Sequence, residues 1–127
     1  MIEVRGRALV LSEGLSLWGG MDPATGELID AHHPQRGASL TGRVVVMPSG
    51  RGSSSSASVL AEAVRARTAP VAILLAEPDL ILDIGSAVAE ELYGTVVPVL
   101  VLGADQLAAI RDGEMVHIGP DATVRTS

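Results

Sequence analysis

The sequence of 127 residues contains no cysteine, no lysine and no phenylalanine. Without cysteine the chain cannot form disulfides, and it offers no thiolate for a zinc or iron–sulfur centre. Without lysine it can form neither a Schiff base nor a P-loop phosphate site. All nine cationic side chains are therefore arginines, each of which can bind a carboxylate or a phosphate with two parallel hydrogen bonds.

Aromatic residues and positive charge are also scarce. The chain has one Trp, one Tyr and a formal net charge of −6, whereas a nucleic-acid binder usually presents a basic surface and stacking aromatic side chains. No apolar run approaches the ~18 residues of a membrane span, and the N-terminal residues do not resemble a signal peptide. We therefore expect a cytoplasmic protein that contacts neither nucleic acid nor membrane.

The first third of the chain combines a strand pattern with a long irregular stretch. Residues 2–11 begin by alternating apolar and charged side chains, which predicts a half-exposed strand. A turn at Glu13-Gly14 follows, and residues 15–17 are expected to form a second short strand. Residues 18–39 are rich in glycine and proline, and we expect an ordered loop there. Connections of that length are usually functional when they are ordered.

From Arg43 onward, strand and helix patterns alternate. Strands are predicted over Val44–Met47, 71–75 and 96–102, and helices over 59–67, 80–92 and 104–111, the last two capped by Asp79 and Asp105. Met115–Ile118 and residues 123–125 are expected to form a closing hairpin. Short links between alternating elements predict parallel strands with crossover helices, and antiparallel strands at the chain ends. The predicted fold is a single compact α/β domain of the β/β/α kind over residues 1–127, with a central, mainly parallel sheet.

The stretch around which the chain is organised is the loop after Val44–Met47. It reads Pro-Ser-Gly-Arg-Gly followed by four serines at positions 53–56, and it leads into a helix. Backbone N–H groups and the positive end of a helix dipole favour an anion at such a place, and Arg51 adds a full charge. The loop lacks the Walker lysine, the glycine spacing of dinucleotide sites and the second glycine of a nucleophile elbow.

This loop is therefore predicted to bind an anion of unspecified kind, and its serine hydroxyls are candidate proton-transfer groups. The plainer alternatives are a flexible Gly/Ser tether and a helix cap, and at least one serine is expected to cap. His32 and His33 read best as one exposed and one packed loop histidine, although Asp30 leaves a metal site open. Glu77-Pro78-Asp79 follows a buried strand, where α/β proteins place ligands, but a turn with a helix cap explains it as well.

These motifs together resemble the small subunit, or swivelling domain, of the aconitase X family of dehydratases. Either the Pro-Ser-Gly-Arg-Gly-Ser loop or the His33-Pro34 segment would be weak by itself, and together they are specific. One departure is that Ala57 stands in the serine tract where the family pattern leads us to expect a glycine. The segments that carry the resemblance are residues 17–22, Ile29-Asp30 with His33-Pro34, residues 45–55, Ala69-Pro70 with Ala72-Ile73, Glu77-Pro78-Asp79, and Gly85 with residues 88–92.

The resemblance implies a hydro-lyase in which this chain supplies a serine base to a large subunit. The base maps to Ser53, with Ser54 and Ser55 as alternatives, and Arg51 would bind the carboxylate or phosphate of a small anionic β-hydroxy acid. Gly50, Gly52, Ser54 and His33 complete the implied substrate contacts. An iron–sulfur cluster or iron is expected on the large subunit, with no metal ligand in this chain. The implied substrates are cis-3-hydroxy-L-proline or phosphomevalonate, and the isolated chain is expected to be inactive.

Two other functions fit the same residues. A non-catalytic subunit would use the loop to bind or sense an anionic ligand, and a purely structural subunit would use it for neither purpose. Removing the Ser53 hydroxyl distinguishes a base from a binding module, because the base is needed for turnover and the module only for affinity.

Overall fold

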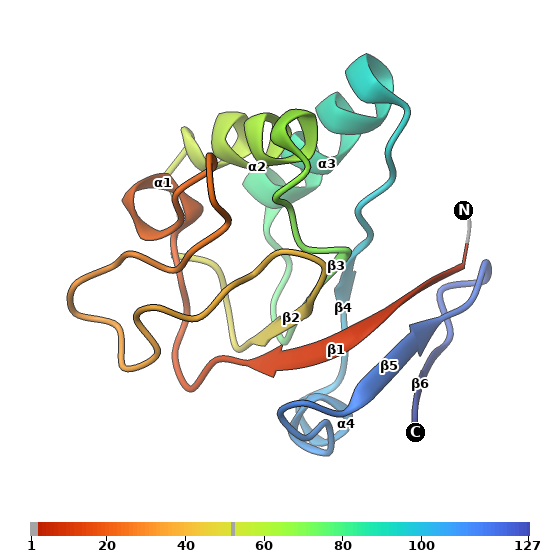
Figure 1. Ribbon diagram of the computed structural model, residues 1–127. Helices are drawn as coiled ribbons and strands as arrows, with labels where there is room; N and C mark the ends of the chain where they lie inside the picture. Colours follow the sequence, from red (N-terminus) through yellow and green to blue (C-terminus); the bar gives the residue numbers. More distant parts are fainter. Residues whose placement is uncertain (1–2, 52) are drawn as a thin grey trace.

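Six strands form one sheet in the computed structural model, which describes residues 3–51 and 53–127 (Figure 1). Their order across the sheet is β4-β3-β2-β1-β5-β6. The strands β1 to β4 are parallel to one another, whereas β5 is antiparallel to β1 and β6 is antiparallel to β5. The bounds are β1 Val4–Val10, β2 Val44–Met47, β3 Ala72–Leu75, β4 Val99–Val101, β5 Met115–Ile118 and β6 Val124–Thr126. The predicted α/β fold, with a mainly parallel centre and antiparallel ends, is confirmed.

The helices lie on both faces of this sheet. They are α1 Leu17–Gly20, α2 Ser56–Ala66, α3 Leu80–Tyr93 and α4 Ala104–Ala108. Figure 1 shows α2 and α3 side by side over one face, with α4 on the opposite side. One core cluster joins α2 and α3 to that first face, and a second joins α4 and β5 to the other. Every residue of β2 and β3 is buried, as their unbroken apolar sequences predict.

The tight pairing of α2 and α3 depends on a glycine. A Cβ atom added to Gly85 would lie 3.0 Å from both the Cα atom and the carbonyl oxygen of Ala57 on α2. Glycine is less favourable than alanine inside a helix, so α3 loses some helix stability at this position and gains close packing against α2. The α3 helix begins as predicted, because an Asp79 Oδ1 atom accepts a hydrogen bond from the Leu82 N–H at 3.0 Å, and it ends at Gly94 with φ +68°.

Several predicted boundaries are wrong for identifiable reasons. Residues 15–17 do not form a strand, because Leu15 makes a single bridge to Gly50 before α1 begins. The β4 strand starts only at Val99, since Pro98 has no N–H to give to a ladder. Asp105 does not cap α4, whose N-cap is Gly103. The α2 helix begins at Ser56, within the serine tract.

The long stretch between α1 and β2 is ordered, as predicted. It is held by two antiparallel bridges, Met21 to Leu28 and Glu27 to Ser39. Met21, Leu28 and Leu40 are buried in the core beneath α2. Among the described residues, no helix has the length and apolar character that crossing a membrane requires.

Candidate active site

The serine-rich loop lies at the edge of the sheet where the parallel strands end. Met47 at the end of β2 pairs with Leu75 at the end of β3, so the segments that follow these strands leave the sheet together. The loop after β2 leads to α2, and the turn after β3 leads to α3. This is the edge at which open α/β sheets bind ligands.

Ser53 makes a tight turn that starts α2. Its Oγ atom accepts a hydrogen bond from the Ser55 N–H at 3.3 Å, and its carbonyl oxygen accepts one from the Ser56 N–H at 2.9 Å. Ser53 is half-buried, whereas Ser54 and Ser55 are exposed. Ser55 occupies the N-cap position but makes no side-chain cap with the described residues, so the prediction of a capping serine at the helix start is wrong.

Ser56 has a structural role that the sequence did not reveal. It is buried, its Oγ atom lies 3.2 Å from Ser16 Oγ, and it accepts a hydrogen bond from the Trp18 N–H at 3.2 Å. These bonds tie the segment around α1 to the start of α2. Four consecutive serines look alike in sequence, and this network separates the last of them from the other three.

Arg51 lies at the rim of the site and contacts an acidic residue. Its guanidinium is 3.6 Å from a Glu13 carboxylate oxygen, and both side chains are largely exposed. An exposed ion pair of this kind adds little stability, typically 0–1 kcal/mol, so an incoming anion can displace Glu13 at small cost. Glu13 was missed as a site residue, because in sequence it reads only as part of a turn.

Two glycines allow the neighbouring segments to close on this loop. A Cβ atom on Gly50 would lie 2.1 Å from Asp79 Oδ2, and one on Gly14 would lie 2.3 Å from the Ser49 carbonyl oxygen. Asp79 therefore caps α3 and also packs directly against the loop. The predicted site residue Gly50 is a close-approach position, and the predicted Gly52 lies outside the described residues.

His33 is a buried residue that supports the loops of the candidate site. It is buried, its Nδ1 atom accepts a hydrogen bond from the Gln35 N–H at 3.0 Å, and its Nε2 atom lies 3.2 Å from the Glu13 carbonyl oxygen. Because Nδ1 accepts, Nε2 carries the hydrogen and donates it to Glu13. Nε2 thus holds the loop that carries Glu13, and Nδ1 fixes the ring to its own segment at Gln35. A direct substrate contact by His33 stays a prediction, and His32 is exposed.

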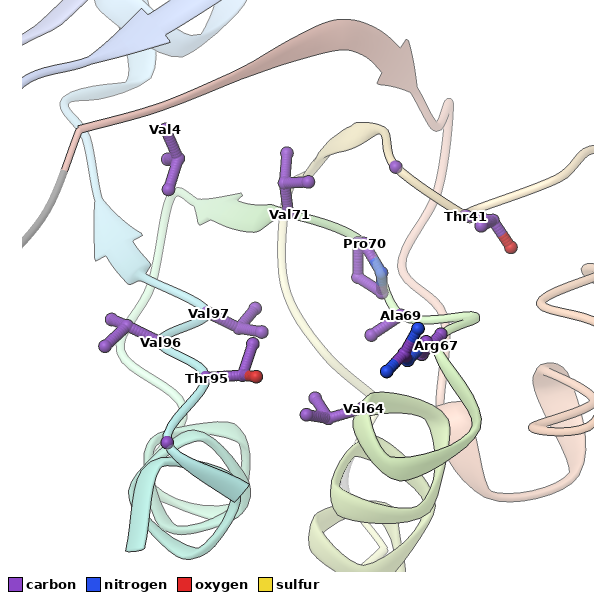
Figure 2. Close-up of a pocket in the computed structure, with 12 residues that line it drawn as sticks. Val4, Thr41, Val64, Arg67, Ala69, Pro70, Val71, Thr95, Val96 and Val97 are labelled. Carbon is purple, nitrogen blue, oxygen red and sulfur yellow. The ribbon is translucent and has the colours of Figure 1, made fainter. Parts of the chain in front are cut away.

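The surface between these groups is a narrow depression with no room for a water molecule. It is lined by Leu15, Leu17, Gly50, Arg51, Ser53, Ser56, Asp79, Ile81 and Leu82. A roomier cavity of about 530 Å³ lies at the opposite end of the strands, where α2 and α3 finish. Figure 2 shows it surrounded by valines from β1, α2 and the segment before β4, with Arg67 at the end of α2. We place the site at the depression, since reactive groups converge there.

The donor atoms at the depression do not fit an iron–sulfur centre. They are serine hydroxyls and one carboxylate already used as a helix cap, and the Arg51 guanidinium beside them has no lone pair for a metal. Iron–sulfur clusters are held mainly by cysteine thiolates, and this chain has none. Within residues 3–51 and 53–127, no three His, Asp or Glu side chains are placed to hold a metal ion together.

The geometry defines an α/β domain that presents a serine- and arginine-bearing loop on an open surface. Comparison with known proteins identifies the family to which this domain belongs. A family model described as the aconitase X swivel domain matches residues 2–126. The chain therefore belongs to the aconitase X swivel-domain family.

Named relatives fall into two groups. A cis-3-hydroxy-L-proline dehydratase of Pseudomonas aeruginosa is 51% identical over 106 residues, which cover 82% of this chain but 18% of the relative. A phosphomevalonate dehydratase small subunit of Methanopyrus kandleri is 46% identical over 82 residues, covering 65% of this chain and 61% of that subunit. The crystal structure of Thermococcus kodakaraensis aconitase X (holo-form) superposes with a TM-score of 0.84 at 28% identity, over 98% of this chain and 90% of the other. This chain thus spans less than a fifth of the first relative and most of the matched chain in the archaeal structure.

Proposed function

We propose that this chain is the small-subunit component of an aconitase-type dehydratase and that Ser53 is its catalytic base. The observation that carries the proposal is the placement of the Ser53 hydroxyl. It is half-buried in the depression at the strand ends, with a backbone N–H directed at its oxygen and Arg51 on the same rim. The dehydratase names of relatives in both groups support the class of reaction.

The proposed proton transfer follows from that placement. The Ser53 oxygen takes the proton from the carbon next to the substrate carboxylate and becomes a neutral hydroxyl, and the electron pair left on that carbon forms the new double bond. The β-hydroxyl leaves as hydroxide with the electrons of the broken C–O bond, and an acid group of the proposed large subunit would take it up. A serine alkoxide is a strong base that ordinary water does not sustain, and each unit by which its pKa is lowered needs ~1.4 kcal/mol of stabilisation. The Ser55 N–H and the start of α2 are the fixed positive groups beside this oxygen, and Arg51 adds a charge at the same rim.

Arg51 is proposed to bind the anionic group of the substrate. A guanidinium matches a carboxylate with two hydrogen bonds, and the weak contact with Glu13 keeps it available. We favour a hydroxy amino acid of the cis-3-hydroxy-L-proline type over a phosphorylated substrate. Identity to the Pseudomonas enzyme is higher over a longer stretch, and Arg51 is the one cation lining the described depression.

A large subunit is proposed to complete the pocket. The depression has no room for a water molecule, so a substrate would have to lie between this surface and another protein surface. Since the donor atoms of this chain do not fit an iron–sulfur centre, we place any such centre on the large subunit. The isolated chain is therefore expected to show no dehydratase activity, and the assembled pair to show it.

The first prediction is a loss of turnover on replacing Ser53. In the complex with the large subunit, Ser53→Ala should lower kcat for cis-3-hydroxy-L-proline by about 10²–10⁴-fold, the usual contribution of a positioned base, with substrate affinity little changed. Ser39→Ala, at an exposed loop serine, is the matched control and should keep wild-type turnover. The measurement is steady-state dehydration together with substrate binding by calorimetry.

Other outcomes have defined meanings. Normal turnover in Ser53→Ala with the same loss in Ser54→Ala or Ser55→Ala would move the base along the tract. Normal turnover in all three, with weaker substrate binding in Arg51→Ala, would support the non-catalytic anion-binding subunit instead. Turnover of phosphomevalonate but not of hydroxyproline would overturn the substrate preference and leave the reaction class intact.

A further inference from the structure

The α3 helix exposes a row of apolar side chains on the side that faces away from the sheet. The row consists of Leu80, Ile84, Val88 and Leu92, which are 70%, 45%, 39% and 63% exposed. Residues four apart lie close together on one side of a helix, and twelve residues span about 18 Å. The buried residues of α3, which are Leu82, Gly85 and Ala89, lie on a neighbouring side of the helix. The exposed row therefore extends the apolar part of α3 beyond the part that the core buries.

The row continues into a groove against the neighbouring helix. The groove has a volume of about 360 Å³ and is lined from α2 by Ala57, Ser58, Ala61 and Glu62, and from α3 by Ile84, Val88 and Tyr93. The small side chains of Ala57, Ser58 and Ala61 on α2 leave space for the groove, and the larger side chains of α3 form one of its sides. Contiguous exposed apolar surface of this kind marks a place where a partner binds.

The charges around the row argue against a second copy of this chain as the partner. The α3 sequence carries Asp83, Glu90 and Glu91 and no basic residue. On the α2 side of the groove Arg65 is paired with Glu62, and neither of the two ion pairs formed by the described residues involves an acid of α3. A two-fold contact would bring these acids and their copies together, in a chain whose net charge is already −6. The charge pattern instead fits an apolar surface bordered by Arg or Lys.

The row also begins at the proposed active site. Leu80 directly follows Asp79, which packs against Gly50 in the depression. On the other side of the depression, the N–H of Trp18 is bonded to Ser56, and the Trp18 side chain is 59% exposed. Exposed apolar groups thus flank the depression, and a protein that covers it would contact Leu80 and then follow α3 toward Leu92.

We propose that the α3 row is the docking surface for the large-subunit part of the dehydratase, which would present an apolar ridge bordered by basic side chains. This inference rests on the proposed function, because it takes the partner from it. The relatives show this domain both within a much longer chain and as a separate small subunit, so the same surface would serve a covalently linked or a separate large-subunit part.

The test is the affinity of this chain for the large subunit expressed as a separate protein. Leu92→Glu and Ile84→Glu place a charge in the row, and each should raise the Kd about 30-fold or more, as expected for a central interface residue. Val101→Glu, at an exposed valine of β4, is the matched control and should stay within about threefold of wild type. Circular dichroism and thermal unfolding check that each variant is folded.

Two further readouts sharpen this test. At saturating large subunit, Leu92→Glu should recover most of the wild-type kcat, since it lies three turns of helix from Asp79, whereas Ser53→Ala should not. Glu91→Arg should weaken binding and reduce its dependence on salt, because it removes attraction to a basic border. Tighter binding by Glu91→Arg would overturn the proposed charge of the partner.

The outcomes separate this inference from the proposed function. If the wild-type chain binds no aconitase-type large subunit, the proposed function fails. If the wild-type chain binds and both row variants bind equally well, the docking surface lies elsewhere and the proposed function stands. If the row variants only convert a dimer of this chain into a monomer, the partner is a second copy and the inference is overturned.

Discussion

The two ends of the parallel strands differ in room and in chemistry. At the amino end, a cavity of about 530 Å³ is lined mainly by valine, alanine, proline and threonine, with Arg67 as its charged residue. At the carboxyl end, the depression has no room for a water molecule, yet Ser53, Arg51 and Asp79 meet there. Cavity volume alone would place the active site at the amino end, whereas the positions of the reactive groups place it at the carboxyl end.

This difference fits the proposed function, in which another protein completes the site. A site that is completed by a partner needs exposed reactive groups on a firm surface, and it needs no closed cavity of its own. The carboxyl end is firm because Gly14 and Gly50 let three segments meet closely, and because His33 and Ser56 hold those segments with buried hydrogen bonds. Changes that loosen this end should therefore matter more than changes at the amino end.

The largest stability effect in this comparison is expected for Gly14→Ala. The added Cβ atom would lie 2.3 Å from the Ser49 carbonyl oxygen, and a backbone atom cannot move without shifting the loop. Overpacking of this kind costs about 1–3 kcal/mol of the free energy of unfolding. Urea unfolding measures it, with Gly103→Ala as the control, because a Cβ atom at Gly103 meets nothing within 4 Å. Equal stability of the two variants would show that the carboxyl end is pliable.

A smaller effect is expected for Asp79→Ala. This change removes the acceptor for the Leu82 N–H, and loss of a helix cap costs typically ~1 kcal/mol. Asp79→Asn keeps a capping oxygen and should recover most of that stability. The thermal unfolding temperatures of the two variants provide the test. If Asp79→Asn and Asp79→Ala lower the unfolding temperature equally, the negative charge beside the helix start contributes the stability and the cap hydrogen bond does not.

Much of the fold was predictable from the sequence because its signals are local. Unbroken apolar runs predicted β2 and β3, and Asp79 with Gly94 marked both ends of α3. The position of the serine-rich loop between a buried strand and a helix was predictable for the same reason, and its role as the active site stays a prediction. Boundaries that depend on contacts far along the chain, such as the single bridge from Leu15 to Gly50, were not predictable.

The roles of individual site residues were less accessible. Glu13 lies 38 positions before Arg51 in sequence, and only the folded chain brings the two together. The four serines look equivalent until Ser56 is seen to be buried against Ser16 and Trp18. His33 was expected at the substrate, and the structure uses both of its ring nitrogens for support. Sequence patterns identify the segment that carries the candidate site residues. The role of each side chain depends on hydrogen bonds between segments that are far apart in sequence.

The smallest effect is expected at the amino end, for Arg67→Gly. Arg67 ends α2 with φ +63°, a left-handed conformation that costs a non-glycine residue about 1–2 kcal/mol. Glycine removes that strain but loses more conformational entropy on folding, so a net stabilisation below about 1 kcal/mol should remain. Ala122→Gly, at a second described residue with positive φ, is the control for the backbone effect. Because Arg67 lines the amino-end cavity and not the depression, turnover of the assembled enzyme should be unchanged. A clear loss of turnover in Arg67→Gly, absent in Ala122→Gly, would mean that the roomier cavity takes part in the reaction, and the contrast between the two ends would have to be abandoned.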